Sequence, residues 1–297
     1  MVRNLEHGMT TYTFVIPHRN NPGLLNRCLG SIPVRDDVQI IVVDDNSREE
    51  SQPDVRRGDV EVIRIDKEHT KGAGHARNVG MQRAEGKWLL FADCDDYYTD
   101  GFIDVLDRYK DEDIDVLYYN FNVVDGKNGR RQDDWKLQKA VSGYDGTEEM
   151  KDCVRYLNNQ PWTKMVSREF VERNNIRFEE VRNGNDVLFA LMTGIRCRRM
   201  AVCQERLYNY VITPGSIGTR RQSLEDILCR FTHYVKHNRV NEMLGHEEWN
   251  DGLLRFIYYE LLVREPLIRK LYLAAAILIK YPRIWHVRNE WVKMIFA

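Results

Sequence analysis

The stretch that most constrains this chain is an apolar run that ends in three closely spaced carboxylates. Residues 88–92 have the character of a buried strand, and Asp93, Asp95 and Asp96 follow at once. Carboxylates this close repel one another, and burying them without a partner is costly. We therefore expect a positive group at the end of this strand, and a divalent cation that carries a phosphate ester is the simplest candidate.

The residues alone leave two interpretations of these carboxylates open. In the first, they form a solvated loop that caps the following helix. In the second, the Asp-x-Asp oxygens hold Mn²⁺ or Mg²⁺ against a diphosphate. A hard cation prefers oxygen to sulfur, so in that case Cys94 would point into the fold.

Short apolar segments alternate with amphipathic ones through the first part of the chain. Strands are expected at 12–17, 38–43, 60–65, 88–92 and 115–124, and helices at 24–32, 76–84 and 101–109. This alternation predicts an α/β, Rossmann-like and mostly parallel sheet with helices on both faces. Ligands of such sheets bind beyond the carboxyl ends of the strands. Pro17-His18, Asp44-Asp45 and Asp93–Asp96 all follow strands, so we expect them to converge at one rim.

The pattern becomes less regular after residue 125 and wholly helical after about residue 220. We expect a hairpin at 125–131, helices at 147–157, 168–174 and 186–194, extended segments at 162–166, 200–203 and 206–211, and late helices at 224–235, 249–263 and 266–280. We divide the chain into a catalytic domain at 1–218, with parts at 10–100 and 101–218, and an all-helical C-terminal appendage at 219–297.

Composition excludes several classes of protein. The formal net charge of −1 gives no sign of nucleic-acid binding. The six cysteines have no CxxC spacing, which favours a reducing, cytoplasmic location over a disulfide or zinc framework. The sequence shows no signal-peptide pattern and no apolar run long enough to span a membrane.

Three further segments each have a structural and a functional interpretation. The segment 72–80 has the pattern of neither a P-loop nor a dinucleotide fingerprint. It is either a flexible loop at the start of a helix, or a glycine-lined loop that a phosphate approaches, with Arg77 as the cation. Asp45 is either part of a turn or a reader of a nucleotide. Asp186 is either a helix N-terminal carboxylate or a general base. His18 is more often a hydrogen-bonded turn residue than a catalyst.

With these residues in hand, the first two-thirds of the chain resembles family 2 glycosyltransferases, which invert configuration and have the GT-A fold. The segments that carry the resemblance are 14–17, 42–47, 74–80, 84–86 and 91–96, in the order and spacing of the family. A weaker resemblance continues through 162–164, 177–178, 185–186 and 207–210.

The resemblance implies a role for particular positions. The residues expected to bind the nucleotide-sugar are Pro17, His18, Arg19, Asp45, Gly74, Arg77, Asp93, Cys94 and Asp95. Asp95, with Asp93, would hold the metal, and Asp186 would be the catalytic base. Asp96, Trp162 and Asn185 are candidate contacts of the donor or acceptor sugar. The family usually has Glu before the base, where this chain has Asn185.

The expected activity is sugar transfer from a nucleotide-sugar, the UDP type being commonest in the family, to a polysaccharide, lipid-linked or protein hydroxyl. The alternatives are a nucleotidyltransferase-like enzyme, which would need a lysine-rich glycine loop that 17–23 lacks, and a non-catalytic nucleotide-sugar-binding protein. The basic, tryptophan-containing tail 264–297 is either packed on the catalytic domain or in peripheral contact with the inner face of the plasma membrane.

Overall fold

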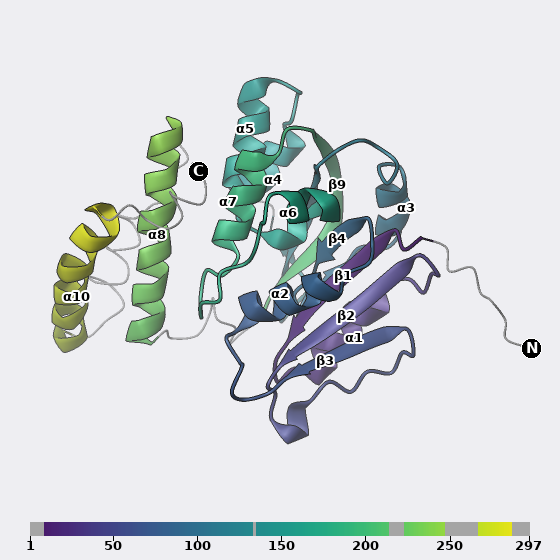
Figure 1. Ribbon diagram of the computed structural model, residues 1–297, viewed down its shortest axis with the longest axis horizontal. Coiled ribbons are helices and arrows are strands. Elements are labelled where there is room, and N and C mark those ends of the chain that lie inside the picture. Colours follow the sequence, from purple (N-terminus) through teal and green to yellow (C-terminus); the bar gives the residue numbers. More distant parts are fainter. Residues whose placement is uncertain (1–8, 133–134, 214–222, 247–266, 287–297) are drawn as a thin grey trace, which may run out of the picture.

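The computed structural model describes residues 9–132, 135–213, 223–246 and 267–286. The described residues form a nine-stranded sheet covered by helices, and α8 and α10 pack together beside it (Figure 1). In chain order the elements are β1 (Tyr12–His18), α1 (Pro22–Ser31), β2 (Val38–Asp45), η1 (Glu49–Ser51), β3 (Val60–Ile65), α2 (Ala73–Arg83), β4 (Trp88–Phe91), β5 (Tyr97–Tyr98), α3 (Phe102–Asp107), β6 (Val116–Asp125), β7 (Arg131–Gln132), α4 (Lys136–Ser142), α5 (Glu148–Leu157), η2 (Pro161–Thr163), β8 (Lys164–Ser167), α6 (Arg168–Arg173), α7 (Val187–Arg196), β9 (Met200–Ile212), α8 (Leu224–Leu244) and α10 (Leu267–His286).

The first half of the sheet is parallel and buried on both faces. Its strands lie in the order β3-β2-β1-β4. Side chains alternate between the faces of a strand, so Ile41 and Val43 pack with Ala76 of α2 while Ile40 and Val42 join the large core that includes α1. Helices therefore cover both faces, as the sequence predicts, and the near-continuous apolar runs are explained by this double burial.

The second half of the sheet mixes strand directions. β8 lies between β4 and β6 and is antiparallel to both, whereas β9 runs parallel to β6. The two-residue strands β5 and β7 pair antiparallel with β9 and β6. Among the longer strands β8 alone is reversed, so the expected mostly parallel α/β fold is confirmed.

Several local predictions need correction. β9 is one strand of residues 200–212, where two were expected, because a register shift against β6 lets the exposed Gln204 and Glu205 pass without ending it. Trp162 and Thr163 belong to the turn η2, which starts at Pro161, and not to the strand that follows. The short elements η1, α4 and β5 were not predicted.

The C-terminal part follows the helical expectation where it is described. α8 starts at a capping box in which the side chains of Ser223 and Asp226 accept from each other's backbone N–H, and it runs nine residues beyond the predicted end. α10 begins within one residue of the predicted last helix and runs six residues beyond its predicted end, and the helix expected at 249–263 lies outside the described residues. None of the described helices is long and apolar enough to cross a membrane. All six cysteines lie in the described ranges, and no disulfide joins any of them.

Candidate functional site

The carboxyl ends of β1, β2 and β4 meet at one edge of the sheet. His18, the last residue of β1, is paired in register with Asp44 of β2. Just after β4, the N–H of Ala92 donates to the carbonyl of Val15 in β1 (3.3 Å), which sets Asp93 beside the same edge. The predicted convergence of three polar elements is therefore confirmed.

His18 is held on both sides of its ring. The backbone N–H of Asn21 donates to Nε2 (3.1 Å), which places the ring proton on Nδ1, where it reaches Oδ1 of Asp44 at 2.8 Å. His18 is buried, and so is Pro17, which is paired with Val43. The side chain of His18 thus fixes the turn after β1, in agreement with the structural interpretation of this residue.

Asp45 forms a polar corner at the end of β2. Its Oδ2 lies 3.2 Å from Nη1 of Arg19, and its Oδ1 accepts from the hydroxyl of Thr70 at 2.6 Å. Asp45 is buried, whereas the Arg19 side chain is more than half exposed. At the end of β2, the exposed guanidinium of Arg19 therefore lies next to the buried carboxylate of Asp45.

Arg77 joins the acidic rim to the segment that carries the candidate base. Its guanidinium donates to Oδ1 of Asp93 (2.5 Å) and to Oδ1 of Asn185 (2.8 Å), and it lies over the ring of Phe178. Arg77 is buried, whereas a third of the Asp93 side chain is exposed. The sequence predicted Asp93 and Asn185 as site residues, but not that the guanidinium of Arg77 would connect the carboxylate of one to the amide of the other.

Gly74, at the start of α2, sits where no side chain fits. A Cβ there would lie 2.0 Å from the carbonyl oxygen of Glu179 and 2.8 Å from Cβ of Asn185. The glycine expected to approach a phosphate therefore allows α2 to pack directly on the segment before α7.

The three carboxylates after β4 have different surroundings. Both oxygens of Asp96 are used within the fold, Oδ1 by the N–H of Val211 (2.7 Å) and Oδ2 by the hydroxyl of Tyr208 (3.0 Å). The same hydroxyl accepts from the N–H of Asp93 (3.0 Å). Burial and the charge of Asp93 raise the pKa of Asp95 to about 6. Asp96 thus anchors β9 to the loop, whereas Asp95 is only partly buried.

The residues fit a metal that a substrate helps to hold. No group of three or more histidine, cysteine, aspartate or glutamate side chains could form a metal cage within the described ranges. No described cation forms an ion pair with the carboxylate of Asp95, and Asp93 shares its charge with Arg77. Mg²⁺ commonly takes one or two carboxylates and completes its shell with water and substrate phosphates. Burial raises the pKa of the Cys94 thiol, so its sulfur stays protonated and is a poor ligand.

Asp186 stands at the N-terminus of α7, and its side chain does not cap that helix. Burial raises the pKa of its carboxyl group, and the charge of Arg77 limits the rise. Lys164 is also fully buried and donates to the carbonyls of Asn158 (3.0 Å) and Gln160 (2.9 Å). Burial lowers the pKa of Lys164 to about 7, against the attraction of Asp186.

Comparison with known proteins identifies the family. The family model described as glycosyl transferase family 2 matches residues 13–184, more than half of the chain. The chain belongs to glycosyltransferase family 2.

Relatives of this family 2 glycosyltransferase include enzymes of cell-surface polymers. TarS of Staphylococcus aureus, a poly(ribitol-phosphate) beta-N-acetylglucosaminyltransferase, is 26% identical over 212 residues, which cover 68% of this chain and 35% of TarS. The succinoglycan biosynthesis protein ExoO of Rhizobium meliloti is 29% identical over 223 residues, which cover 69% of this chain and 62% of ExoO. The chain therefore spans about a third to three fifths of the length of these relatives.

A solved structure shows the same fold. The crystal structure of S. aureus TarS 1–349 in complex with UDP-GlcNAc superposes with a TM-score of 0.64 at 19% sequence identity, covering 92% of this chain and 82% of that one. This likeness confirms the GT-A fold expected from the sequence.

Some residues of this candidate site were not singled out from the sequence. Trp162 was, but it is buried and its ring stacks on Tyr208 (4.9 Å between centroids) and Tyr210 (5.3 Å). Its predicted sugar contact stays a prediction. Tyr208 and Thr70 act through neighbours far apart in sequence, whereas Lys164 donates to carbonyls four and six residues before it. The only available signal was that Tyr208 and Lys164 fall in segments that resemble the family.

Proposed function

We propose that this protein is an inverting glycosyltransferase that moves a sugar from a UDP-type nucleotide-sugar to a hydroxyl group of a cell-surface polysaccharide. The observation that carries the proposal is the continuous link from Asp93 through Arg77 to Asn185, beside the candidate base Asp186. This link sets a rim suited to a diphosphate next to a group that can accept a proton. The complex of TarS with UDP-GlcNAc supports the choice of donor.

The donor would lie along the carboxyl ends of β1, β2 and β4. Asp45 would face the base or ribose, with Arg19 and Thr70 fixing its orientation. Arg77 would stabilise the negative charge that develops on the departing diphosphate. Asp95, with Asp93, would hold Mn²⁺ or Mg²⁺, which supplies further positive charge to the leaving group when bound.

Asp186 would act on the acceptor. Its carboxylate would remove the proton of the attacking hydroxyl, which approaches the anomeric carbon from the face opposite the diphosphate, so that configuration inverts. Burial moves the pKa of this carboxyl upward, towards the pH at which the enzyme works, and a base is most effective there.

The test combines a donor screen with one variant. Thermal-shift assays against a panel of nucleotide-sugars, with and without Mn²⁺, should show stabilisation by a UDP-sugar that depends on the metal. Asp186→Asn should bind that donor normally but turn over about 10²–10⁴-fold more slowly. The exposed Asp111→Asn is the matched control and should behave like the wild type. Normal turnover by Asp186→Asn would refute the assignment of the base.

We further propose that α10 contacts an anionic membrane, which is the second of the two alternatives given for residues 264–297. Leu267, Leu271 and Ile279 lie on one i, i+4 row of the helix and are exposed, as is Tyr272 beside them. The sequence of α10 contains basic residues and no acid. An apolar face beside basic side chains suits the interface of an anionic bilayer at the inner face of the plasma membrane.

Flotation with lipid vesicles tests this contact. The wild type should float with phosphatidylglycerol vesicles and not with phosphatidylcholine vesicles. Leu271→Ser combined with Tyr272→Ser should weaken binding by about tenfold or more, because two apolar side chains leave the interface. Val34→Ser removes an exposed apolar side chain elsewhere and is the control. Equal flotation of all three proteins would count against the membrane role.

A further inference from the structure

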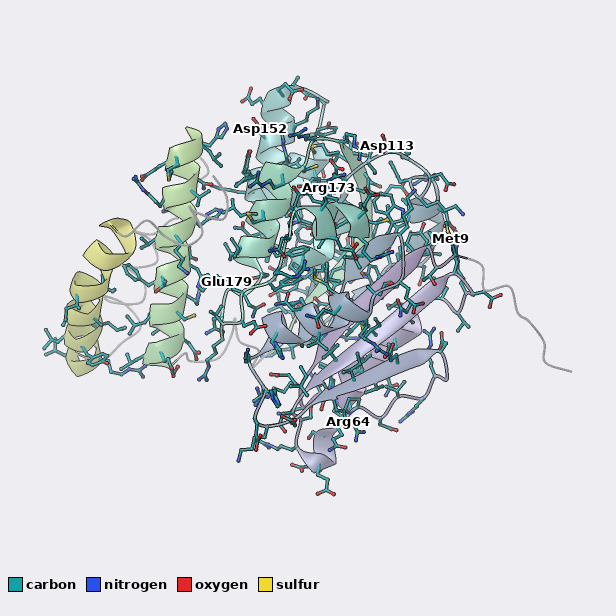
Figure 2. The ribbon with its side chains drawn as sticks, in the orientation of Figure 1. Met9, Arg64, Asp113, Asp152, Arg173 and Glu179 are labelled. Atoms are coloured by element: carbon teal, nitrogen blue, oxygen red, sulfur yellow. The ribbon has the colours of Figure 1, made fainter. Side chains whose placement is uncertain are left out.

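The helix α8 lies against the segment that leads to Asp186. Figure 2 labels Glu179 in this segment, on the side that faces α8. This segment is contacted by Asp226, Cys229, His233 and Lys236, which share one face of α8 by their spacing. Glu225 of α8 also lies 3.7 Å from Arg182. We call residues 179–186 the base segment. A helix of the C-terminal region thus contacts the part of the chain that presents the candidate base.

The first turns of α8 bind the middle of the base segment. Oδ1 of the buried Asp226 accepts from Nδ2 of Asn183 (2.8 Å) and from Nε of Arg182 (2.8 Å). One turn further along, the thiol of Cys229 donates to the carbonyl of Asn183 (3.3 Å). Asn183 is therefore held by both its side chain and its backbone.

His233 binds the start of the base segment through an ion pair. Its Nε2 lies 2.9 Å from Oε2 of Glu179, and its Nδ1 lies 2.8 Å from the carbonyl of Cys229. Both ring nitrogens face acceptors, so the imidazolium form is favoured. Nζ of Lys236 lies 3.2 Å from the other oxygen of Glu179. Glu179 therefore forms ion pairs with two side chains of α8.

His233 also fits closely against Gly184. Gly184 has a φ of +70°, and a Cβ there would lie 2.9 Å from Cγ of the imidazole. The N–H of Glu179 donates to the carbonyl of Asn185 (3.1 Å), which closes the base segment into one loop. Through these contacts, the position of the His233 ring affects the position of the residues directly before Asp186.

We propose that α8 is a positioning element for catalysis, in which His233 holds Glu179 and Gly184 so that Asp186 faces the acceptor hydroxyl. His233 is then a positioning residue, since it acts through the base segment and touches no substrate. The inference rests on the proposed function, in which Asp186 is the base. It gives the C-terminal helical region a part in the reaction that is distinct from membrane contact.

The charged and titratable groups around His233 predict a pH signature. They are Glu179 from the base segment, Cys229 and Lys236 from α8 itself, and Asp186 at longer range. Burial alone would lower the pKa of His233, but its contacts with Cys229 and Glu179 raise the pKa to about 9. The imidazolium in turn lowers the pKa of Asp186. Removing this charge should therefore shift the acidic limb of the kcat/KM profile to higher pH.

Two variants of the full chain test the inference. His233→Gln removes the cation, and Glu179→Gln removes its partner while leaving α8 intact. In each, hydrogen exchange of backbone amides in 179–186 should be about tenfold faster or more. We expect kcat to fall about tenfold with donor KM within about twofold, since the base is displaced and the donor rim is not. The double variant should be no worse than either single one.

The partly exposed Lys151→Gln, which loses an ion pair with Glu148 on α5, is the control and should match the wild type. Of the two variants, only His233→Gln should move the acidic limb of the kcat/KM profile to higher pH, and Glu179 keeps its charge in that variant. Simple destabilisation would not produce this shift. Unchanged exchange in 179–186 in both variants would overturn the inference. If the wild type transfers no sugar, the proposed function fails, and the exchange result by itself still decides whether α8 holds the base segment.

Discussion

The two carboxylate centres of this site are built in different ways. Asp93 and Asp95 follow β4 directly, and the parallel pairing of β1, β2 and β4 brings their neighbours to the same edge. Asp186 lies at the end of the loop between α6 and α7, which depends on α2 and α8 for its position. The comparison shows that strand order brings Asp93 and Asp95 to the rim, whereas the position of Asp186 depends on contacts between distant elements.

The largest expected effect comes from removing the residue that joins the two centres. Arg77→Met should lower the free energy of unfolding by about 3 kcal/mol, the low end for a broken buried pair, because Asp93 keeps 32% of its side chain exposed. It should also abolish donor binding. Chemical denaturation and calorimetry measure the two effects. The control is Arg83→Met on the same helix, which loses only an exposed pair with Glu61.

A second prediction concerns the pH dependence of stability that comes from the buried Lys164, whose pKa Asp186 helps to set. The pKa of Lys164 is lowered to about 7, so between pH 7 and about 10 the unfolded chain binds more protons at this residue than the folded protein. Stability from this group should therefore rise by about 1 kcal/mol per pH unit across that window. Denaturation curves of Lys164→Met should lack this rise, whereas those of the exposed Lys127→Met should keep it. Parallel pH curves for the wild type and Lys164→Met would refute burial of the amine.

The smallest effect concerns the acidic loop alone. Tyr208→Phe removes the hydroxyl that bonds Asp93 and Asp96, and should cost about 1–3 kcal/mol by leaving buried polar groups unpaired. Tyr210→Phe keeps the stacking on Trp162 and should change stability by less than about 0.5 kcal/mol. Thermal denaturation of both variants checks the difference. Equal losses would mean that the rings, and not the Tyr208 hydroxyl, hold the loop.

Much of the donor half could be predicted from the sequence. Continuous apolar runs gave β1, β2 and β4, and the polar residues after them marked the rim. Asp186 was also placed correctly at the start of a helix, because the apolar spacing of α7 is clear. In each case the signal lies within about a dozen neighbouring residues.

The rest depends on contacts that no local pattern carries. Gln204 and Glu205 interrupt the apolar alternation of β9, and only the register shift against β6 explains why the strand continues. The role of Tyr208 follows from the meeting of β9 with the loop after β4. His233 occurs in an ordinary helical pattern, and nothing in that pattern indicates Glu179 as its partner.

The brief strand β5 has a consequence for how the acidic loop meets its ligand. Residues 92–96 connect β4, which ends at Phe91, to β5, which starts at Tyr97, and both strands belong to one sheet. A connection this short, fixed at both ends, has little freedom to move its carboxylates apart. Their mutual repulsion is therefore imposed when the chain folds, and the ion pair of Arg77 with Asp93 offsets part of it. In the proposed function, the repulsion that remains would favour the binding of a metal cation at Asp95, and its size is set by the length of this loop.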